Sequence, residues 1–258
     1  RELRRRKRRS NKPLAVMVRD LAAAVRLCQI DDAEGALLTG TVRPIVLLQR
    51  RTTDAARGDA HVRDDVSGSA AALAPSVAGD LPELGIMLPY TPLQHLLLAA
   101  CEPHGVSALV MTSGNVSEEP IETDDALAWR HLVEGGLADA LLGNDRAILA
   151  RFDDSVARVI DGTLRLVRRA RGFAPRPLPL PAMGASAPAA VLACGPEQKA
   201  TLALTREHTD GSAECLVSQH IGDLENAETF DTWHATRMHM EALFDLHPTA
   251  LACDRHPA

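Results

Sequence analysis

The chain has 258 residues and a formal net charge of −6; 46% of its residues are hydrophobic and only 3% are aromatic. This length allows one large domain or two smaller ones, with a core built mainly from Ala, Val and Leu. The acidic balance argues against a general nucleic-acid-binding surface, and five cysteines without CxxC spacing argue against a zinc ribbon or a disulfide framework. No signal peptide or apolar run of about 18 residues is present, so we expect a cytoplasmic protein without a membrane segment.

The first part of the chain opens with eight basic side chains within residues 1–12. Apolar runs then predict buried strands over 13–18 and 44–48. Helical spacing predicts helices over 20–28, with Asp20 as N-cap, and over 31–39. Residues 51–80 are rich in Ala, Asp, Gly, Arg and Ser without periodicity, and we expect a mobile surface loop without chemistry there.

The middle of the chain contains its most informative segment. A helix is predicted over 91–101, capped by Thr91 and with Leu93, Leu96 and Leu97 on one face. The apolar run at 108–111 then ends in a loop of small hydroxyl, glycine and amide residues. This pattern is typical of a buried strand that carries a polar loop at its carboxyl end. Such a loop is either a turn and helix cap or a site for phosphate and ribose oxygens, with Ser113 and Asn115 as donors and acceptors.

The following residues continue the alternation of strands and helices. Segments 124–132 and 137–142 extend that alternation, and strands over 155–160 and 163–167 form a hairpin across Asp161 and Gly162. Five prolines mixed with Ala and Gly then predict a stiff linker over 173–190.

Beyond the linker, we expect a strand meander at 191–194, 201–205 and 213–218, a helix over 226–246 and a strand at 250–253. The candidate core residues of the helix are Phe230, Trp233, Met238, Leu243 and Phe244. We expect this segment to supply too few strands to cover both faces of its sheet, so that apolar surface stays exposed. The apolar side chains expected to stay exposed are Leu192, Leu202, Leu204, Leu216, Val217 and Leu251. The chain is therefore expected to be a fragment of a longer protein.

The basic run at the start has several interpretations. Lys7 and Arg9, with Arg8 and Lys12 nearby, can neutralise a triphosphate and its departing pyrophosphate. A solvated basic helix explains the same charges. A double-stranded RNA-binding face is a third interpretation, although no aromatic residue interleaves the run to stack on bases of a single strand.

Taken in order, these segments resemble the hydrogenase-maturation carbamoyltransferase family HypF, and the resemblance covers nearly the whole chain. The segments that carry it are 7–17, 43–48, 83–98, 112–121, 153–156, 168–172, 193–205 and 218–226. The resemblance implies an α/β fold, in which a YrdC-like twisted open sheet with helices is followed by an incomplete actin-like ATPase-type domain. It implies an N-terminally truncated YrdC-like domain at 1–172, a linker at 173–190 and the N-terminal part of a transferase domain at 191–258.

The resemblance also implies which residues face the nucleotide. The implied nucleotide-binding residues are Lys7, Arg9, Ser113, Asn115, Ser155 and Arg168, with Arg169 as the alternative to Arg168. In the second domain, Gly195 and Lys199 match a phosphate loop. Arg146 and Asp153 are expected to form an internal ion pair rather than to contact a ligand, and no metal ligands or catalytic residues are assigned.

The implied activity is that of a carbamoyltransferase and adenylate-forming ligase, although the fragment is expected to be inactive alone. ATP, together with Mg²⁺, activates a carbamoyl group from carbamoyl phosphate to carbamoyl-adenylate, and the group passes to the C-terminal cysteine of a carrier protein. Zinc is implied only for parts of the family that lie outside this chain. Two alternatives stay open: a threonylcarbamoyl-adenylate synthase acting in tRNA modification, and a double-stranded RNA-binding module.

Overall fold

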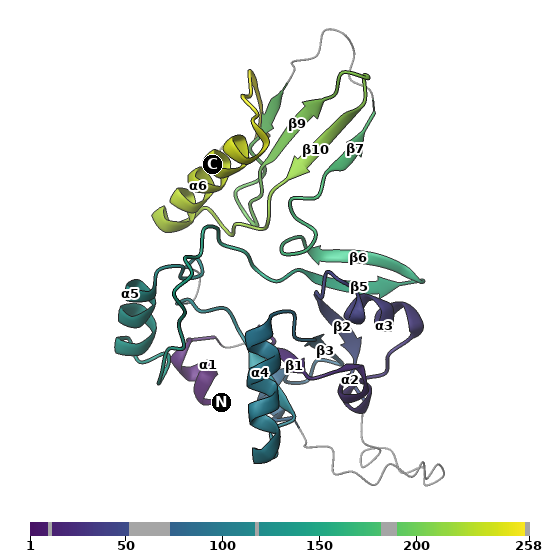
Figure 1. The fold of residues 1–258 in the computed structure, drawn as a ribbon, viewed down its shortest axis with the longest axis vertical. Coiled ribbons are helices and arrows are strands. Elements are labelled where there is room, and N and C mark those ends of the chain that lie inside the picture. The colour runs from purple at the N-terminus through teal and green to yellow at the C-terminus, as the bar shows by residue number, and fades with distance from the viewer. Residues whose placement is uncertain (10–11, 52–72, 117–118, 182–189, 256–258) are drawn as a thin grey trace. The chain divides into compact units, whose positions relative to one another are not determined.

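A computed structural model describes residues 1–9, 12–51, 73–116, 119–181 and 190–255 of the chain (Figure 1). The chain folds into two compact units. One consists of Arg1–Ser10, Ser113–Ser155 and Arg168–Ala258, and the other of Asn11–Thr112 and Val156–Val167. Both units interleave distant parts of the sequence, and domain limits at 172 and 190 stay a prediction. Most of the loop predicted at 51–80 lies outside the described residues.

The second of these units contains a six-stranded mixed sheet with the order β4-β1-β3-β2-β5-β6. Its strands are β1 (Ala15–Val18), β2 (Ile45–Gln49), β3 (Glu83–Met87), β4 (Ala108–Met111), β5 (Val156–Ile160) and β6 (Thr163–Arg168). β1 pairs with β3, and β2 with β5, in parallel; β1–β4 and β2–β3 are antiparallel. The predicted hairpin is confirmed, since Asp161 and Gly162 between β5 and β6 both have positive φ angles.

Two features of this sheet differ from expectation. β4 was predicted to be a buried strand, but it lies at the edge of the sheet and Val110 is 38% exposed. β3 has no counterpart among the predicted strands. This strand contains Gly85, where a Cβ atom would come within 3.0 Å of the Ile45 side chain. The close packing of β2 against β3 therefore favours glycine at this position.

The helices of this unit begin where their caps predict. The elements are α2 (Leu21–Leu27), α3 (Asp32–Thr39), α4 (Pro92–Cys101) and the short 3-10 helices η2 (Pro75–Val77) and η3 (Glu102–His104). Asp20 and Thr91 cap α2 and α4 by accepting hydrogen bonds from backbone N–H groups. The leucines on one face of α4 do not face the core: Leu96 is 69% exposed, whereas Leu98 is buried.

The other unit contains α1 (Glu2–Arg6), a short helix α5 (Asp125–Ala128) that runs into the π-helix η4 (Trp129–Glu134), and α6 (Ala227–Phe244). No regular helix or strand is present over the described residues 137–142, so the alternation predicted there is wrong. A five-stranded sheet has the order β11-β8-β9-β10-β7. Its strands are β7 (Leu178–Leu180), β8 (Val191–Ala193), β9 (Ala203–Glu207), β10 (Ala213–Val217) and β11 (Ala250–Ala252).

The predicted meander is confirmed, but part of the predicted linker belongs to the sheet. β7 lies within 173–190 and pairs antiparallel with β10, with Leu178 opposite Cys215. Pro179 occupies this edge strand, where a missing N–H is tolerated because one side of the strand needs no partner.

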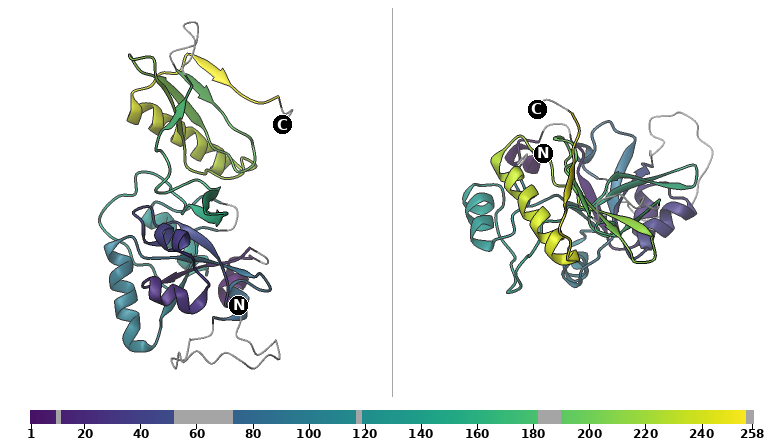
Figure 2. Two further views of the ribbon diagram at one scale, coloured as in Figure 1. Left: turned by 90° about the vertical axis from the view of Figure 1, so that its right-hand side faces the viewer. Right: turned by 90° about the horizontal axis from the view of Figure 1, so that it is seen from above.

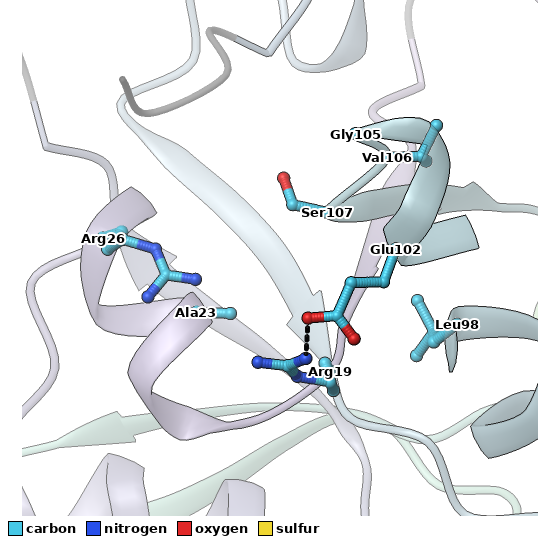
Figure 3. Close-up of a pocket in the computed structure, with 8 residues that line it drawn as sticks. All are labelled: Arg19, Ala23, Arg26, Leu98, Glu102, Gly105, Val106 and Ser107. Carbon is cyan, nitrogen blue, oxygen red and sulfur yellow. Dashed lines mark hydrogen bonds and ion pairs between the residues drawn. The ribbon is translucent and has the colours of Figure 1, made fainter. Parts of the chain in front are cut away.

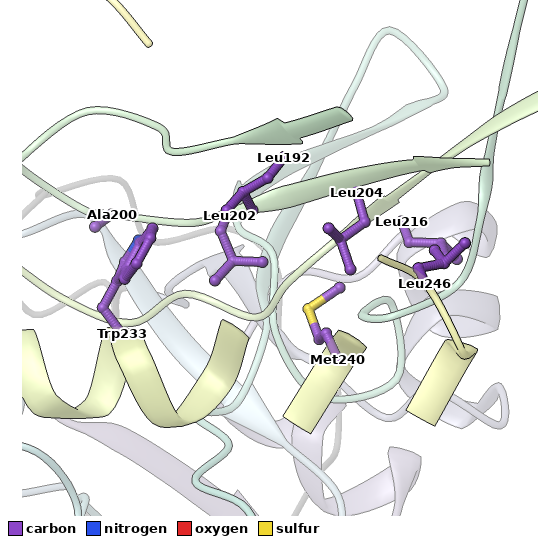
Figure 4. Close-up of a cluster of buried hydrophobic side chains, with 8 residues drawn as sticks. All are labelled: Leu192, Ala200, Leu202, Leu204, Leu216, Trp233, Met240 and Leu246. Carbon is purple, nitrogen blue, oxygen red and sulfur yellow. The ribbon is translucent and has the colours of Figure 1, made fainter. Parts of the chain in front are cut away.

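The prediction of an exposed apolar face is wrong for most of the residues named. α6 lies along the second sheet (Figures 1 and 2) and buries Leu192, Leu202, Leu204 and Leu216 beneath it. Figure 4 shows these leucines facing Trp233 and Met240 of the helix. Of the named residues, Leu251 stays 73% exposed and Val217 is half-buried.

The core residues predicted on α6 are also partly wrong. Trp233 is buried and Phe244 packs against the cluster, but three others are 50–62% exposed: Phe230, Met238 and Leu243. The buried face instead carries Thr229, Thr232, Trp233, Thr236 and Met240. Since three of these five are threonines, hydrophobicity alone does not identify the face that meets the sheet.

Within the described residues, no helix is long and apolar enough to cross a membrane.

Candidate functional site

Lys7 is the most unusual side chain of the predicted site, because it is only 5% exposed. It forms the C-cap of α1, and its Nζ donates hydrogen bonds to the Ser113 carbonyl at 2.6 Å and to Asn115 Oδ1 at 3.1 Å. Three of the predicted nucleotide-binding residues therefore meet although more than a hundred positions separate Lys7 from the loop. We call the group formed by Lys7, Ser113 and Asn115 the lysine corner.

The loop of the lysine corner is held by its own hydrogen bonds. The Ser113 hydroxyl donates to Asn115 Oδ1 at 2.6 Å, and Asn115 Nδ2 donates to the Glu119 carbonyl. The backbone N–H of Glu122 donates to the Gly114 carbonyl at 2.9 Å. Asn115 Oδ1 thus accepts hydrogen bonds from both Ser113 and Lys7. These bonds hold the Asn115 amide, the Ser113 hydroxyl and the Lys7 ammonium group in fixed positions without a ligand.

The electrostatics of the lysine corner favour an anion. Burial, and then the nearby charge of Arg9, lower the pKa of Lys7 to about 8. Both effects disfavour the ammonium form, and the negative charge of a nearby phosphate would offset both of them. Arg9 itself is held by its backbone, since its N–H donates to the Arg4 carbonyl at 3.0 Å. The charge of Arg9 thus acts on Lys7, and a contact of either residue with a nucleotide stays a prediction.

The basic run is not a uniform positive face. Arg5 and Arg6 both pair with Glu2 within α1, and Arg6 also pairs with Asp139 at 2.7 Å. The burial of Lys7 and the ion pairs of Arg5 and Arg6 show that the charges of this run differ in their environments, and RNA binding stays an untested alternative. The burial of Lys7 is what distinguishes the lysine corner from ordinary surface charge.

Ser155 lies in a second group of predicted residues. Its side chain is fully buried; the hydroxyl donates to the Arg171 carbonyl at 3.0 Å and accepts from the Ala170 N–H at 2.8 Å. The backbone N–H of Arg171 also donates to the Asp153 carbonyl. These bonds join segment 153–155 to segment 168–171, and a contact of Ser155 with a ligand stays a prediction.

The two neighbouring arginines have different environments, which bears on the open choice between them. The Arg169 guanidinium donates to the backbone carbonyls of Val217 and Arg176 at 3.1 and 2.8 Å, and burial lowers its pKa. Arg168 instead lies 3.6 Å from Asp153 Oδ2. Because the Arg169 guanidinium is hydrogen-bonded to two backbone carbonyls, Arg168 is the better candidate for a phosphate contact.

The predicted ion pair between Arg146 and Asp153 is wrong. Asp153 Oδ2 pairs with Arg168 and with His220 Nδ1, the latter at 3.1 Å, whereas Arg146 is exposed. Burial opposes ionisation of Asp153, but the hydrogen bond from His220 and the charge of Arg168 outweigh it and lower the pKa of the carboxyl. The local sequence pattern does not predict the contact of His220 with Asp153, because the two residues are 67 positions apart.

Gly195 and Lys199 lie on a loop of their own after β8. Gly195 has a φ of +72°, and a Cβ there would come within 2.1 Å of the Thr201 carbonyl oxygen, so no other residue fits. Lys199 also has a positive φ, is exposed, and its N–H donates to Asp223 Oδ1 at 2.6 Å. The match of Gly195 and Lys199 to a phosphate loop, and any phosphate contact there, stays a prediction.

A further pair behind the lysine corner was not predicted. His131 Nδ1 lies 2.5 Å from Glu122 Oε1, and Glu122 holds Gly114 through its backbone. The two residues meet only because η4 folds back on the loop, so no sequence signal marked them.

A small pocket of about 180 Å³ contains none of the predicted site residues. Its lining is Arg19, Ala23, Arg26, Leu98, Glu102, Gly105, Val106 and Ser107 (Figure 3). Arg19 pairs with both Glu102 and Asp20, so its charge is already balanced by two carboxylates.

Known proteins match this chain in two consecutive stretches. A family model for Sua5, YciO and YrdC proteins, described as "Telomere recombination", matches residues 1–170. The chain belongs to this family. A second model, described as "HypF Kae1-like domain", matches residues 186–258, and together the two matches confirm the resemblance to HypF and the YrdC-like α/β fold.

Relatives over the full chain bear the HypF name. The chain is 41% identical to "Carbamoyltransferase HypF" of Rhizobium leguminosarum bv. viciae and 42% identical to "Carbamoyltransferase HypF2" of Cupriavidus necator, each over 99% of its length. A crystal structure of full-length HypF in the phosphate- and nucleotide-bound form superposes with a TM-score of 0.84 at 38% identity over 99% of this chain. The chain spans about 30% of the length of each of these proteins.

Proposed function

We propose that the first region of the chain, which is the matched stretch at residues 1–170, binds ATP at the lysine corner and forms carbamoyl-adenylate, as part of carbamoyl transfer in nickel–iron hydrogenase maturation. The second region is the other matched stretch, residues 186–258. The relatives named carbamoyltransferase, and the nucleotide-bound structure to which the chain is similar, support the reaction class. Arg168 is proposed as a further contact, and the buried Ser155 as the residue that holds the backbone beside it through its bonds to Ala170 and Arg171.

The observation that carries this proposal is the buried ammonium of Lys7, with Arg9 beside it. Burial of a charged group is unfavourable unless it serves hydrogen bonds or a ligand. A depressed pKa of about 8 keeps Lys7 mostly charged at neutral pH, and a nucleotide phosphate would complete its environment. The neighbouring Ser113 and Asn115 fix where that charge lies.

These residues suit an adenylation step. Hydrolysis of carbamoyl phosphate first releases inorganic phosphate and leaves carbamate. An oxygen of the carbamate then attacks the α-phosphorus of ATP, a new phosphorus–oxygen bond forms, and the bond to pyrophosphate breaks. Negative charge then grows on the leaving pyrophosphate, where fixed cations stabilise it in a site shielded from water. Lys7 and Arg9 are proposed to provide that charge, while Ser113 and Asn115 hold Lys7 in place.

Mg²⁺ normally accompanies ATP, where it neutralises phosphate charge. The donors of the lysine corner are ammonium, hydroxyl and amide groups, whereas Mg²⁺ prefers carboxylate oxygens and water. The carboxylate of Asp153 is taken by Arg168 and His220. The residues of the lysine corner therefore do not fit a protein-held Mg²⁺.

The transfer step would involve the second region. We propose that the carbamoyl group passes from the adenylate to the C-terminal cysteine of a carrier protein, with Gly195 and Lys199 forming one edge of the second site. The match to the HypF Kae1-like domain favours this acceptor over the tRNA of a threonylcarbamoyl-adenylate synthase.

Two measurements test the proposal. Calorimetric titration of the purified chain should show ATP binding that is lost in Lys7→Ala. A hybrid in which this chain replaces the matching part of the Rhizobium relative should exchange labelled pyrophosphate into ATP when carbamoyl phosphate is added. Exchange that needs threonine and bicarbonate instead would identify the tRNA-modifying activity. Equal ATP affinity in wild type and Lys7→Ala would show that the lysine corner is not the ATP site.

A further inference from the structure

The segment between β10 and α6 contacts both stretches that hold Ser155 and Arg168. His220 Nδ1 lies 3.1 Å from Asp153 Oδ2, and the backbone N–H of His220 donates to the Arg169 carbonyl at 2.9 Å. Residue 220 belongs to the stretch that matches the HypF Kae1-like domain, whereas 153 and 169 belong to the YrdC-like stretch. One residue of the second region thus connects two segments of the first.

The side chains of His220 and Arg168 meet on one oxygen atom. Arg168 Nη1 lies 3.6 Å from Asp153 Oδ2, the same oxygen that faces His220. His220 and Asp153 are both largely buried, with 20% and 22% of their side chains exposed. A carboxylate held by a fixed imidazole has fewer orientations, and so does the arginine that pairs with it.

The backbone around this group is also fixed. Ser155 bridges Ala170 and Arg171, while Arg169 donates to the carbonyls of Val217 and Arg176. The guanidinium of Arg169 is therefore occupied by backbone carbonyls, whereas the guanidinium of Arg168 faces the carboxylate of Asp153.

We propose that His220 is a positioning residue that orients Asp153 and, through it, the Arg168 guanidinium toward the nucleotide, so that the second region completes the ATP site of the first. This inference rests on the function proposed above. It predicts that ATP affinity depends on a residue outside the YrdC-like stretch.

ATP titration of the purified 258-residue chain tests the inference. His220→Ala should weaken ATP binding about tenfold, because Asp153 loses the partner that restrains it. His220→Asn should restore the affinity to within about threefold, since its amide nitrogen can take the place of Nδ1. His239→Ala, an exposed histidine on α6, is the matched control and should leave affinity unchanged.

A double-mutant cycle separates positioning from a general structural role. If His220 acts through Arg168, His220→Ala should have no further effect in an Arg168→Ala background, whereas a structural defect would weaken binding there too. An additive loss, or unchanged affinity in both His220 variants, would overturn the inference. If Lys7→Ala still abolishes binding in that case, the proposed function stands; if the wild-type chain binds no ATP, both proposals fail.

Discussion

The two lysines matched to phosphate-binding segments have opposite environments. Lys7 is buried, donates to Ser113 and Asn115, and has a pKa lowered to about 8. Lys199 is exposed on a loop held by backbone contacts, among them the bond from its own N–H to Asp223. The first site is thus organised around a charge, whereas the second loop is organised around packing and backbone geometry. Substitutions in the two regions should therefore affect different properties, ligand affinity in the first and stability in the second.

The largest effect expected is on stability, from the core beneath the second loop. Trp233 is 9% exposed, and its indole N–H donates to the Cys194 carbonyl, next to Gly195. Trp233→Ala should lower the free energy of unfolding by about 3–5 kcal/mol, through lost burial and the cavity left behind. Phe230→Ala on the same helix is the control, because Phe230 is 50% exposed. Equal losses in urea denaturation would show that α6 does not pack as described.

The next effect contrasts the two lysines directly. Lys7→Ala should weaken ATP binding about a hundredfold, which corresponds to about 2.7 kcal/mol, because a charged donor to phosphate is lost. Lys199→Ala should change affinity less than about twofold, within the usual range for surface substitutions. Calorimetric titration measures both. A larger effect of Lys199→Ala would move the principal ATP site to the second region.

A smaller effect on ATP binding is expected when Lys7 is kept and Asn115, which accepts a hydrogen bond from it, is replaced. Asn115→Ala should weaken ATP binding about thirtyfold, or about 2 kcal/mol, since the Ser113 hydroxyl loses its acceptor and Lys7 keeps the Ser113 carbonyl but loses Asn115 Oδ1. The matched control is Asn144→Ala, because Asn144 is exposed and its side chain accepts a hydrogen bond from the Arg146 N–H within its own turn. Equal affinity in Asn115→Ala and wild type would show that Lys7 does not need this support.

The smallest effect concerns pH. The folded-state pKa of Lys7, about 8, lies below its ordinary value, so Lys7 loses its charge as pH rises through 8. ATP affinity should fall about tenfold between pH 7 and pH 9, following the fraction of charged lysine. Lys7→Arg, which stays charged, should show a flat profile over this range. A fall of equal size in Lys7→Arg would assign the titration to another group.

The same pKa shift has a consequence for stability with a definite sign. Between pH 8 and the ordinary lysine range, the unfolded chain binds more protons at Lys7 than the folded chain does. The free energy of unfolding should therefore rise with pH across this window in wild type, and this rise should be absent in Lys7→Met.

The sequence by itself determined the capped helices, the hairpin turn and the candidate site residues. The helix caps Asp20 and Thr91 and the Asp161–Gly162 turn depend only on residues a few positions away. They can therefore be identified without the rest of the chain. The order of motifs was sufficient to identify the family, and with it Lys7, Ser113 and Asn115 as candidates.

Only the tertiary structure decided which of these residues are buried and which of them meet. The burial of Lys7, the exposure of Leu96 and the threonine-rich inner face of α6 depend on neighbours that are distant in the sequence. For the same reason, the sequence paired Asp153 with the nearby Arg146, whereas the fold brings Arg168 and His220 to it. Ion pairs and burial are set by distance in space, which hydrophobic periodicity and residue spacing along one chain do not encode.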